Sequence, residues 1–170
     1  FIDVQVNGGG GALLNDDPGV ETVRTIALSH RRFGTVGLLP TVITDAPEII
    51  ARAVDSVARA MAEGIPGVLG IHIEGPFLDV ARMGAHAARF IRAMDEADAD
   101  QIARFARRCP VMLTLAPNRV PPALVQKLTQ AGVLVSLGHA ETSYQEARHA
   151  LDAGARAITH LYNAMSQMTG

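Results

Sequence analysis

One short stretch, Gly70–Leu78 (GIHIEGPFL), places an ionisable carboxylate at the end of an apolar strand. Ile71 and Ile73 are typical of a strand buried in a core, whereas Glu74 follows them directly and Gly75-Pro76 ends the run. A buried carboxylate that has no partner is costly in free energy. Glu74 therefore requires a neighbour that neutralises its charge.

His139 and His160 occupy equivalent places, because each follows its own apolar, strand-like run. One carboxylate and two imidazoles are a competent ligand set for Zn²⁺ or another divalent ion. A single histidine near a strand end is more often a hydrogen-bonded structural residue than a ligand. Three such residues, each at a strand end, favour a metal site, although they obey no short local motif.

The remaining histidines are expected to be structural. His72 lies two residues before Glu74, so both side chains leave the same face of the strand. It is a deeper ligand, a support for a ligand, or a hydrogen-bonded core residue, and we favour the last two. His30 and His149 fall in amphipathic helical segments and are expected at the surface or in helix packing.

Short apolar runs alternate with amphipathic segments along the chain. The runs are rich in Val, Ile and Leu rather than strictly alternating, which is typical of parallel strands buried on both faces. The expected strands are Phe1–Val6, Thr35–Ile43, Val68–Ile73, Val111–Ala116, Val133–Leu137 and Ala157–Leu161. The expected helices are Glu21–Phe33, Pro47–Ala62, Ala97–Arg108, Pro122–Ala131 and Tyr144–Ala153, with Asp45 and either Asp95 or Asp98 as N-terminal caps.

This alternation predicts right-handed crossovers and a parallel sheet, either a doubly wound open sheet or a (β/α)8 barrel. An open sheet concentrates its site at one switch point, whereas a barrel collects polar groups from the ends of all its strands. Polar residues follow nearly every expected strand here: Gln5, Asn7, Thr41, Thr44, Glu74, Asn118, His139, His160 and Asn163. We therefore expect one domain over residues 1–170 with a partial (β/α)8 barrel.

The glycine run Asn7–Gly11 (NGGGG) leaves the first expected strand. Its backbone N–H groups could cradle a phosphate, or the run is simply a flexible loop. Both interpretations stay open. The chain has no GxxxxGK[ST] motif, which argues against a nucleotide-binding P-loop.

Composition narrows the functional classes. The 170 residues are 48% hydrophobic and 19% charged, with a net charge of −2 and no cationic stripe, so neither nucleic acid nor a membrane surface is an expected partner. The one cysteine, Cys109, excludes an internal disulfide and is expected to be buried rather than nucleophilic. No signal peptide and no apolar run near the ~20 residues of a membrane helix is present, and a cytoplasmic location is expected.

Several motifs follow one another over essentially the whole chain: FIDVQVNGGGG (1–11), LPT (39–41), GIHIEGPFL (70–78), GAH (84–86), LAPN (115–118), SLGHA (136–140) and THLYNAM (159–165). In this order they resemble one known family, N-acetylglucosamine-6-phosphate deacetylase of the amidohydrolase superfamily. Membership implies a metal-bearing (β/α)8 barrel with a small β-domain that is built from the two chain ends and is not expected in this chain.

The resemblance implies a site residue by residue. Glu74, His139 and His160 match the metal ligands of the family. Gln5-Val-Asn7 stands where many amidohydrolases carry His-x-His, which implies one divalent metal ion, most often Zn or Fe, with Gln5 near its water. His86 matches the residue that polarises the substrate carbonyl. The positions that line the amino-sugar phosphate site are Ala85, His86, Asn163 and Ala164.

The implied reaction is hydrolysis of the linear amide of N-acetyl-D-glucosamine 6-phosphate to glucosamine 6-phosphate and acetate. The general-base aspartate of the family is absent from this chain, and a phosphate-binding arginine would follow Gly170. The resemblance also implies a homodimer for the full-length protein. We therefore expect these 170 residues alone to be inactive. The alternatives are a deacetylase for another N-acetylated amino sugar and a non-catalytic fragment.

Overall fold

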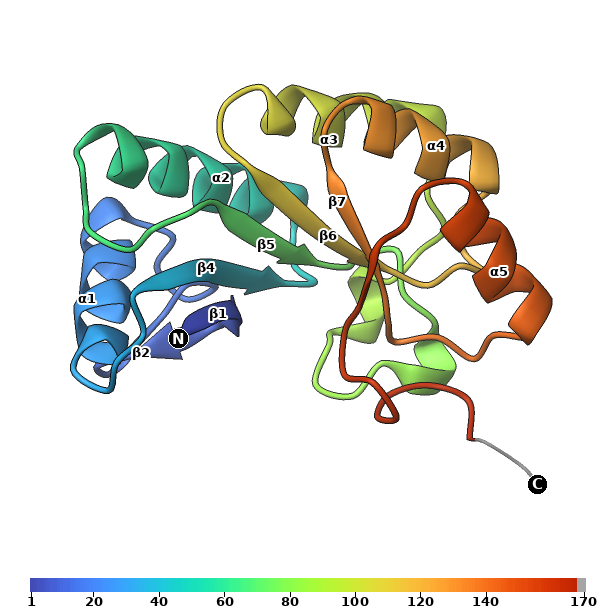
Figure 1. Cartoon of the computed structure of the whole chain (residues 1–170), viewed down its shortest axis with the longest axis horizontal. Helices are drawn as coiled ribbons and strands as arrows, with labels where there is room; N and C mark the ends of the chain where they lie inside the picture. The colour runs from blue at the N-terminus through green and yellow to red at the C-terminus, as the bar shows by residue number, and fades with distance from the viewer. Residues whose placement is uncertain (168–170) are drawn as a thin grey trace.

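The fold is built around one curled sheet of parallel strands (Figure 1). The computed structural model describes residues 1–167. The last three residues of the predicted domain, up to Gly170, lie outside the described residues, and its extent as one domain stays a prediction. Within residues 1–167 the main sheet has six strands in the order β1-β4-β5-β6-β7-β8: Ile2–Val6, Gly37–Ile43, Ile71–Glu74, Val111–Leu115, Leu134–Leu137 and Ala157–Ile158.

The helices follow one another around the outside of this sheet in the order of the strands (Figure 1). Each lies between two consecutive strands of the sheet, as the right-handed crossover rule requires for parallel neighbours. The helices are α1 (Val20–Arg31), α2 (Pro47–Ala62), α3 (Glu96–Ala106), α4 (Pro122–Gln130) and α5 (Tyr144–Asp152). Two 3₁₀ turns, η1 (Val80–Arg82) and η2 (Ala88–Phe90), interrupt the segment between β5 and α3.

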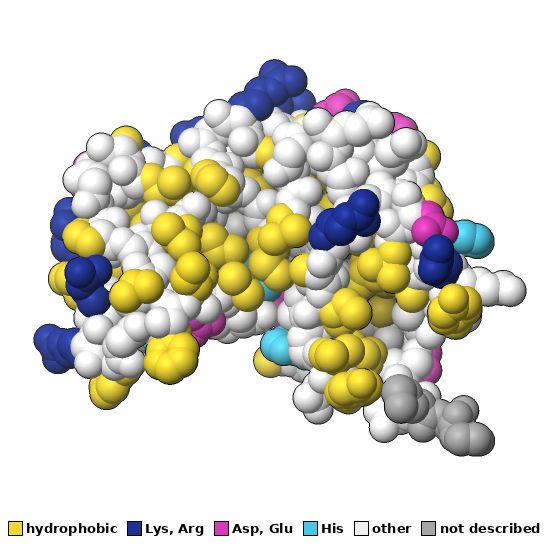
Figure 2. All heavy atoms as spheres, viewed as in Figure 1, with side chains coloured by type: hydrophobic (Ala, Val, Ile, Leu, Met, Phe, Trp, Pro, Cys, Tyr) yellow, Lys and Arg dark blue, Asp and Glu magenta, His cyan; other side chains and the backbone are white. Residues whose placement is uncertain are grey.

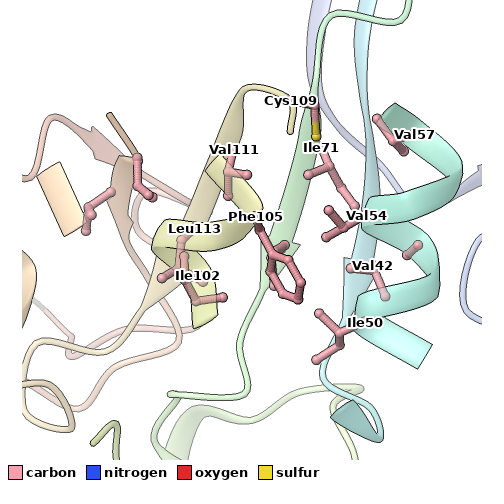
Figure 3. Close-up of a cluster of buried hydrophobic side chains, with 14 of the residues drawn as sticks. Val42, Ile50, Val54, Val57, Ile71, Ile102, Phe105, Cys109, Val111 and Leu113 are labelled. Atoms are coloured by element: carbon pink, nitrogen blue, oxygen red, sulfur yellow. The ribbon is translucent and has the colours of Figure 1, made fainter. Parts of the chain in front are cut away.

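The core lies between the sheet and the helices (Figure 3). Val54 of α2 and Phe105 of α3 pack in the same cluster as Ile71 of β5 and Leu113 of β6. Burying such side chains contributes about 1.5–3 kcal/mol each. Cys109 belongs to this cluster, which confirms that it is buried, and burial raises the pKa of its thiol to about 11.

Every strand is shorter than the range expected for it, and two of them lose three residues at one end. The run from Val68 to Ile73 begins its strand only at Ile71, and Val68 makes an isolated bridge to Leu38 instead. The run from Ala157 to Leu161 ends at Ile158, because the chain turns at His160, which has a φ of 55°. Apolar content predicts burial in both places, but the backbone conformation limits the pairing.

The helix caps agree only in part with the sequence. Asp95 caps α3 through a capping box with Asp98, as expected. Asp45 does not cap α2: Ala46 stands at the cap position, the cap makes no side-chain hydrogen bond, and the Asp45 carboxylate accepts from Asn15 and from Ala46 N–H. The helix therefore begins one residue later than an Asp45 cap would require, and the alanine at the cap position has no side-chain oxygen to offer.

The glycine run after β1 forms part of an ordered hairpin rather than a flexible loop, and phosphate binding by it stays a prediction. Gly8 and Gly9 form strand β2, which pairs antiparallel with β3 (Ala12–Leu13). A Cβ at Gly8 would lie 2.4 Å from the Ala12 carbonyl oxygen, so this close hairpin requires glycine. His30 of α1 holds the hairpin from the other side, with Nε2 2.9 Å from the Gly8 carbonyl oxygen, as a packing histidine should.

Apolar side chains stay exposed along the outer strands. Ile2 and Val4 of β1 and Ile158 of β8 are 67%, 45% and 49% exposed, and these two strands form the edges of the sheet. Figure 2 shows hydrophobic side chains gathered over the face in view. Within the described residues no helix has the length and apolar character to cross a membrane, and the predicted cytoplasmic location stays a prediction.

The entry to β5 generates a stability prediction. A Cβ at Gly70 would lie 2.4 Å from the Pro110 carbonyl oxygen, which accepts the neighbouring Ile71 N–H, whereas a Cβ at Gly64 meets nothing within 4 Å. Both glycines have positive φ. We expect Gly64→Ala to cost about 1 kcal/mol of unfolding free energy from backbone strain alone. Gly70→Ala should cost about 1–3 kcal/mol more because of the clash. Urea unfolding measures both, and equal losses would contradict the assigned contact.

Candidate metal centre

Glu74 is the hub of the site. It ends β5 with only 2% of its surface exposed. Its Oε1 accepts from His139 Nε2 at 3.1 Å and from His160 Nε2 at 3.0 Å, while Oε2 accepts from the Gln5 amide at 2.6 Å. These partners come from β1 and from the segments that follow β7 and β8. The structure thus brings together four of the residues that the sequence singles out.

The surroundings of Glu74 strongly favour its ionised form. Burial alone would raise the pKa of this group, but the hydrogen bond from His139 and the nearby imidazoles of His86 and His72 outweigh it and lower the pKa to about 2. Glu74 is therefore ionised throughout the neutral range. A buried, fully charged carboxylate that is surrounded by ring nitrogens suits a cation.

His139 has a defined orientation. Its Nδ1 lies 2.8 Å from the Arg82 carbonyl oxygen, which can only accept, so Nδ1 carries a proton and donates it there. Burial opposes protonation of the ring, but the contact with Glu74 outweighs it and raises the pKa of His139. Nε2 is consequently the atom that faces the carboxylate, and it is the atom available to a metal.

His86 has the opposite orientation. Its Nδ1 accepts from the Thr44 backbone N–H at 3.4 Å and lies 2.8 Å from the Thr44 hydroxyl. Burial, assisted by the neighbouring His139, lowers the pKa of His86 to about 4, so the ring is neutral at pH 7. A neutral ring whose Nδ1 accepts carries its proton on Nε2, and that nitrogen lies 3.9 Å from Glu74 Oε2.

The side chains present fit a divalent metal. One ligand atom each from Glu74, His86 and His139 lies within 4.8 Å of the other two. The predicted set replaces His86 with His160, whose Nε2 lies 3.0 Å from Glu74 Oε1 and whose side chain is 39% exposed. Both sets offer one oxygen and two imidazole nitrogens, which is the donor chemistry of Zn²⁺ and Fe²⁺ sites.

A hollow of about 450 Å³ opens above these groups. The predicted site residues Gln5, Glu74, Ala85, His86, His139 and His160 line it, together with Asn7, Leu13, Asn15, Asp16 and Ile43. Asn163 and Ala164 are not among the residues that line it, and their role in substrate binding stays a prediction. The volume of the hollow is in the range of small-molecule binding sites.

The sequence did not predict that Asn15 lines this hollow. The Asn15 side chain accepts from Ile43 N–H at 3.0 Å and donates to the Ile43 carbonyl at 3.2 Å, which ties the β2–β3 hairpin to the end of β4. The polar run Asn15-Asp16-Asp17 was the available signal, but it reads equally well as an ordinary turn.

The sequence is similar to curated proteins along almost the whole chain. No family model matches the chain. An N-acetylgalactosamine-6-phosphate deacetylase from Shewanella sp. (strain ANA-3) is 43% identical over 170 residues, which is 99% of this chain and 43% of the relative. An N-acetylglucosamine-6-phosphate deacetylase from Haemophilus influenzae is 34% identical over 99% of this chain and 44% of its own length.

A solved structure of a deacetylase is also similar to this chain. The crystal structure of N-acetylglucosamine-6-phosphate deacetylase from Pasteurella multocida superposes with a TM-score of 0.95 at 34% identity, over 100% of this chain and 45% of that one. The chain is therefore similar, along almost its whole length, to amino-sugar phosphate deacetylases. It spans less than half the length of the deacetylases that it matches.

The agreement with the solved deacetylase also confirms the predicted fold class. The curled parallel sheet with its outer helices corresponds to a partial (β/α)8 barrel of the amidohydrolase type. Glu74, His139 and His160 lie at the carboxyl ends of strands, where barrels place their active sites. Their roles as ligands stay a prediction.

Next to Glu74 lies a row of buried, hydrogen-bonded polar groups that starts at His72. His72 is fully buried; its Nδ1 lies 3.0 Å from the Val4 carbonyl oxygen and its Nε2 2.7 Å from the Thr114 hydroxyl. That hydroxyl lies 2.7 Å from Thr159 Oγ1, which lies 2.7 Å from Ser136 Oγ. Both ring nitrogens are therefore occupied, and His72 is a hydrogen-bonded core residue, as expected, rather than a ligand.

Glu74 generates the prediction for this site. Glu74→Gln keeps the volume but removes the charge, so Zn²⁺ affinity should fall by more than about 100-fold, beyond the loss typical of residues that only support ligands. Competition with a chromophoric chelator measures the affinity. Glu63→Gln, an exposed glutamate after α2, is the matched control and should bind like the wild type. Unchanged affinity in Glu74→Gln would exclude Glu74 as a ligand.

Proposed function

We propose that the protein hydrolyses the acetamide of N-acetyl-D-glucosamine 6-phosphate to glucosamine 6-phosphate and acetate. The observation that carries the proposal is the buried, ionised Glu74 in the lining of a hollow. Its carboxylate accepts hydrogen bonds from the imidazoles of His139 and His160. Similarity to amino-sugar phosphate deacetylases along the whole chain supplies the substrate class.

Glu74, His139 and His160 would hold one divalent metal ion, with Zn²⁺ and Fe²⁺ as the candidates. When bound, such an ion lowers the pKa of water and polarises a carbonyl oxygen. Gln5 donates to Glu74 Oε2 and so leaves Oε1 facing the imidazoles. His160 is a better third ligand than His86, because the Thr44 N–H occupies His86 Nδ1 and leaves the proton on Nε2.

His86 would act as a hydrogen-bond donor to the substrate. Its protonated Nε2 faces the hollow, where it can donate to the acetamide oxygen as negative charge develops there. Because the pKa of His86 is lowered to about 4, the ring stays neutral and donates from a fixed tautomer. Thr44 holds that tautomer and orients the ring through Nδ1.

A second substrate has support of its own. The relative that is 43% identical is an N-acetylgalactosamine-6-phosphate deacetylase, which favours the C4 epimer over the gluco substrate. A deacetylase of the same galacto substrate from Escherichia coli is only 32% identical, so identity alone does not decide the epimer.

The proposal also includes a homodimer for the full-length protein. The alternative function is a binding protein that catalyses no reaction.

The decisive experiment measures acetate release by the full-length protein. We expect release from one or both sugar 6-phosphates, much slower release from the unphosphorylated sugars, and loss of activity with EDTA that Zn²⁺ or Fe²⁺ restores. The exposed-residue variant His149→Ala should behave like the wild type. No release from either epimer with any divalent metal would leave only the binding role.

Two histidine variants separate ligand from donor. Removing a hydrogen-bond donor to a developing oxyanion costs about 10²–10³ in kcat, so His86→Ala should lose that activity while its Zn²⁺ affinity stays close to wild type. His160→Ala should instead lose Zn²⁺ affinity. Chelator competition and steady-state kinetics on both variants test the assignment. The reverse pattern would make His86 the ligand and His160 the donor.

A further inference from the structure

The backbone at His139 has to be held by its surroundings. His139 is one of the non-glycine residues with positive φ, at 49°, a conformation that costs free energy and persists only when neighbours fix it. Two contacts from the turn Asp79–Arg82 do this. The Asp79 N–H donates to the His139 carbonyl at 2.9 Å, and the Arg82 carbonyl accepts from His139 Nδ1 at 2.8 Å.

The turn is itself organised by the carboxylate of Asp79. Oδ1 accepts from the Ala81 N–H at 3.1 Å, which caps η1, and the Asp79 carbonyl accepts from Arg82 N–H at 2.9 Å. These bonds set the direction in which the Arg82 carbonyl points. Asp79 is 5% exposed, and nothing in the metal centre contacts its carboxylate directly.

The same carboxylate reaches a third loop. Oδ2 accepts from the Asn118 amide at 2.5 Å, and Oδ1 accepts from the Arg119 guanidinium at 3.2 Å. Asn118 and Arg119 follow β6, whereas Asp79 follows β5 and His139 follows β7. Asp79 therefore links the segments after three consecutive strands of the sheet: its carboxylate bonds the segment after β6, and its backbone N–H bonds His139 after β7.

We infer that Asp79 is a positioning residue that fixes the orientation and tautomer of His139 through the turn Asp79–Arg82. The inference deepens the proposed function, because it assigns the support of a proposed ligand. Asp79 acts through hydrogen bonds only. The capped turn presents the Arg82 carbonyl to Nδ1, and Nε2 is thereby directed to Glu74 and to a metal. Residues that support histidine ligands in this way typically contribute 10–100-fold to metal affinity.

The test uses two readouts on the purified full-length protein. The first is Zn²⁺ affinity by chelator competition. The second is solvent exchange of the His139 Nδ1–H proton by NMR, which needs neither metal nor substrate. Asp79→Ala should weaken Zn²⁺ binding by about 10–100-fold and should speed the exchange of that proton by a similar factor. Asp79→Asn keeps an acceptor for the Ala81 N–H and should recover most of both properties.

Control variants separate positioning from general stability. Asp95→Ala removes a capping aspartate of the same kind from α3, far from His139 in the chain, and should change neither readout. Should Asp79→Ala fail to fold, Arg119→Ala removes an exposed partner of the same carboxylate. It should weaken Zn²⁺ binding about 2- to 5-fold, as expected for one partly exposed ion pair.

Two results would overturn the inference. One is wild-type Zn²⁺ affinity and wild-type Nδ1–H exchange in Asp79→Ala, or in Arg119→Ala where the first variant does not fold. The other is an equal loss in Asp95→Ala. A wild-type protein that binds no Zn²⁺ and releases no acetate would refute the proposed function, while the exchange of the His139 proton would still decide the role of Asp79.

Discussion

A single buried negative charge constrains much of this structure. Glu74 is almost fully removed from water, and the energetic cost of burying a carboxylate is tolerable only when charged or hydrogen-bonding partners replace the lost hydration. Those partners are Gln5 from the first strand and His139 and His160 from segments after the last two strands of the sheet. None is near Glu74 in sequence. The charge is therefore satisfied only after the sheet has assembled, which couples the formation of the site to the formation of the fold.

Two histidines at this site show how the backbone assigns chemistry to identical side chains. At His139 a carbonyl oxygen faces Nδ1, so that nitrogen must donate and Nε2 is left to face the carboxylate. At His86 a backbone N–H faces Nδ1, so that nitrogen accepts and Nε2 keeps a proton. The residue type alone does not distinguish a ligand from a donor. The distinction comes from one backbone group on the far side of each ring.

Much of the architecture could be predicted from the residues, and the errors have local causes. The strand ends that carry Glu74, His139 and His160 were recognisable, because polar side chains stand out against runs of Val, Ile and Leu. The Asp45 cap was wrong, since Ala46 rather than Asp45 occupies the position before the first helical residue. The hairpin at Gly8 and the network of Asp79 could not be foreseen. Both depend on contacts, with Ala12 or with Asn118, that only the folded chain brings about.

The buried chain that starts at His72 has a direction. Because the Val4 carbonyl takes the proton of Nδ1, Nε2 has to receive the hydrogen of Thr114. Thr114 in turn receives from Thr159, and Thr159 from Ser136. Three hydroxyl dipoles are thus aligned head to tail, with one arrangement of protons selected by one backbone oxygen. Burial lowers the pKa of His72 to about 4, so the ring stays neutral and this alignment persists at neutral pH.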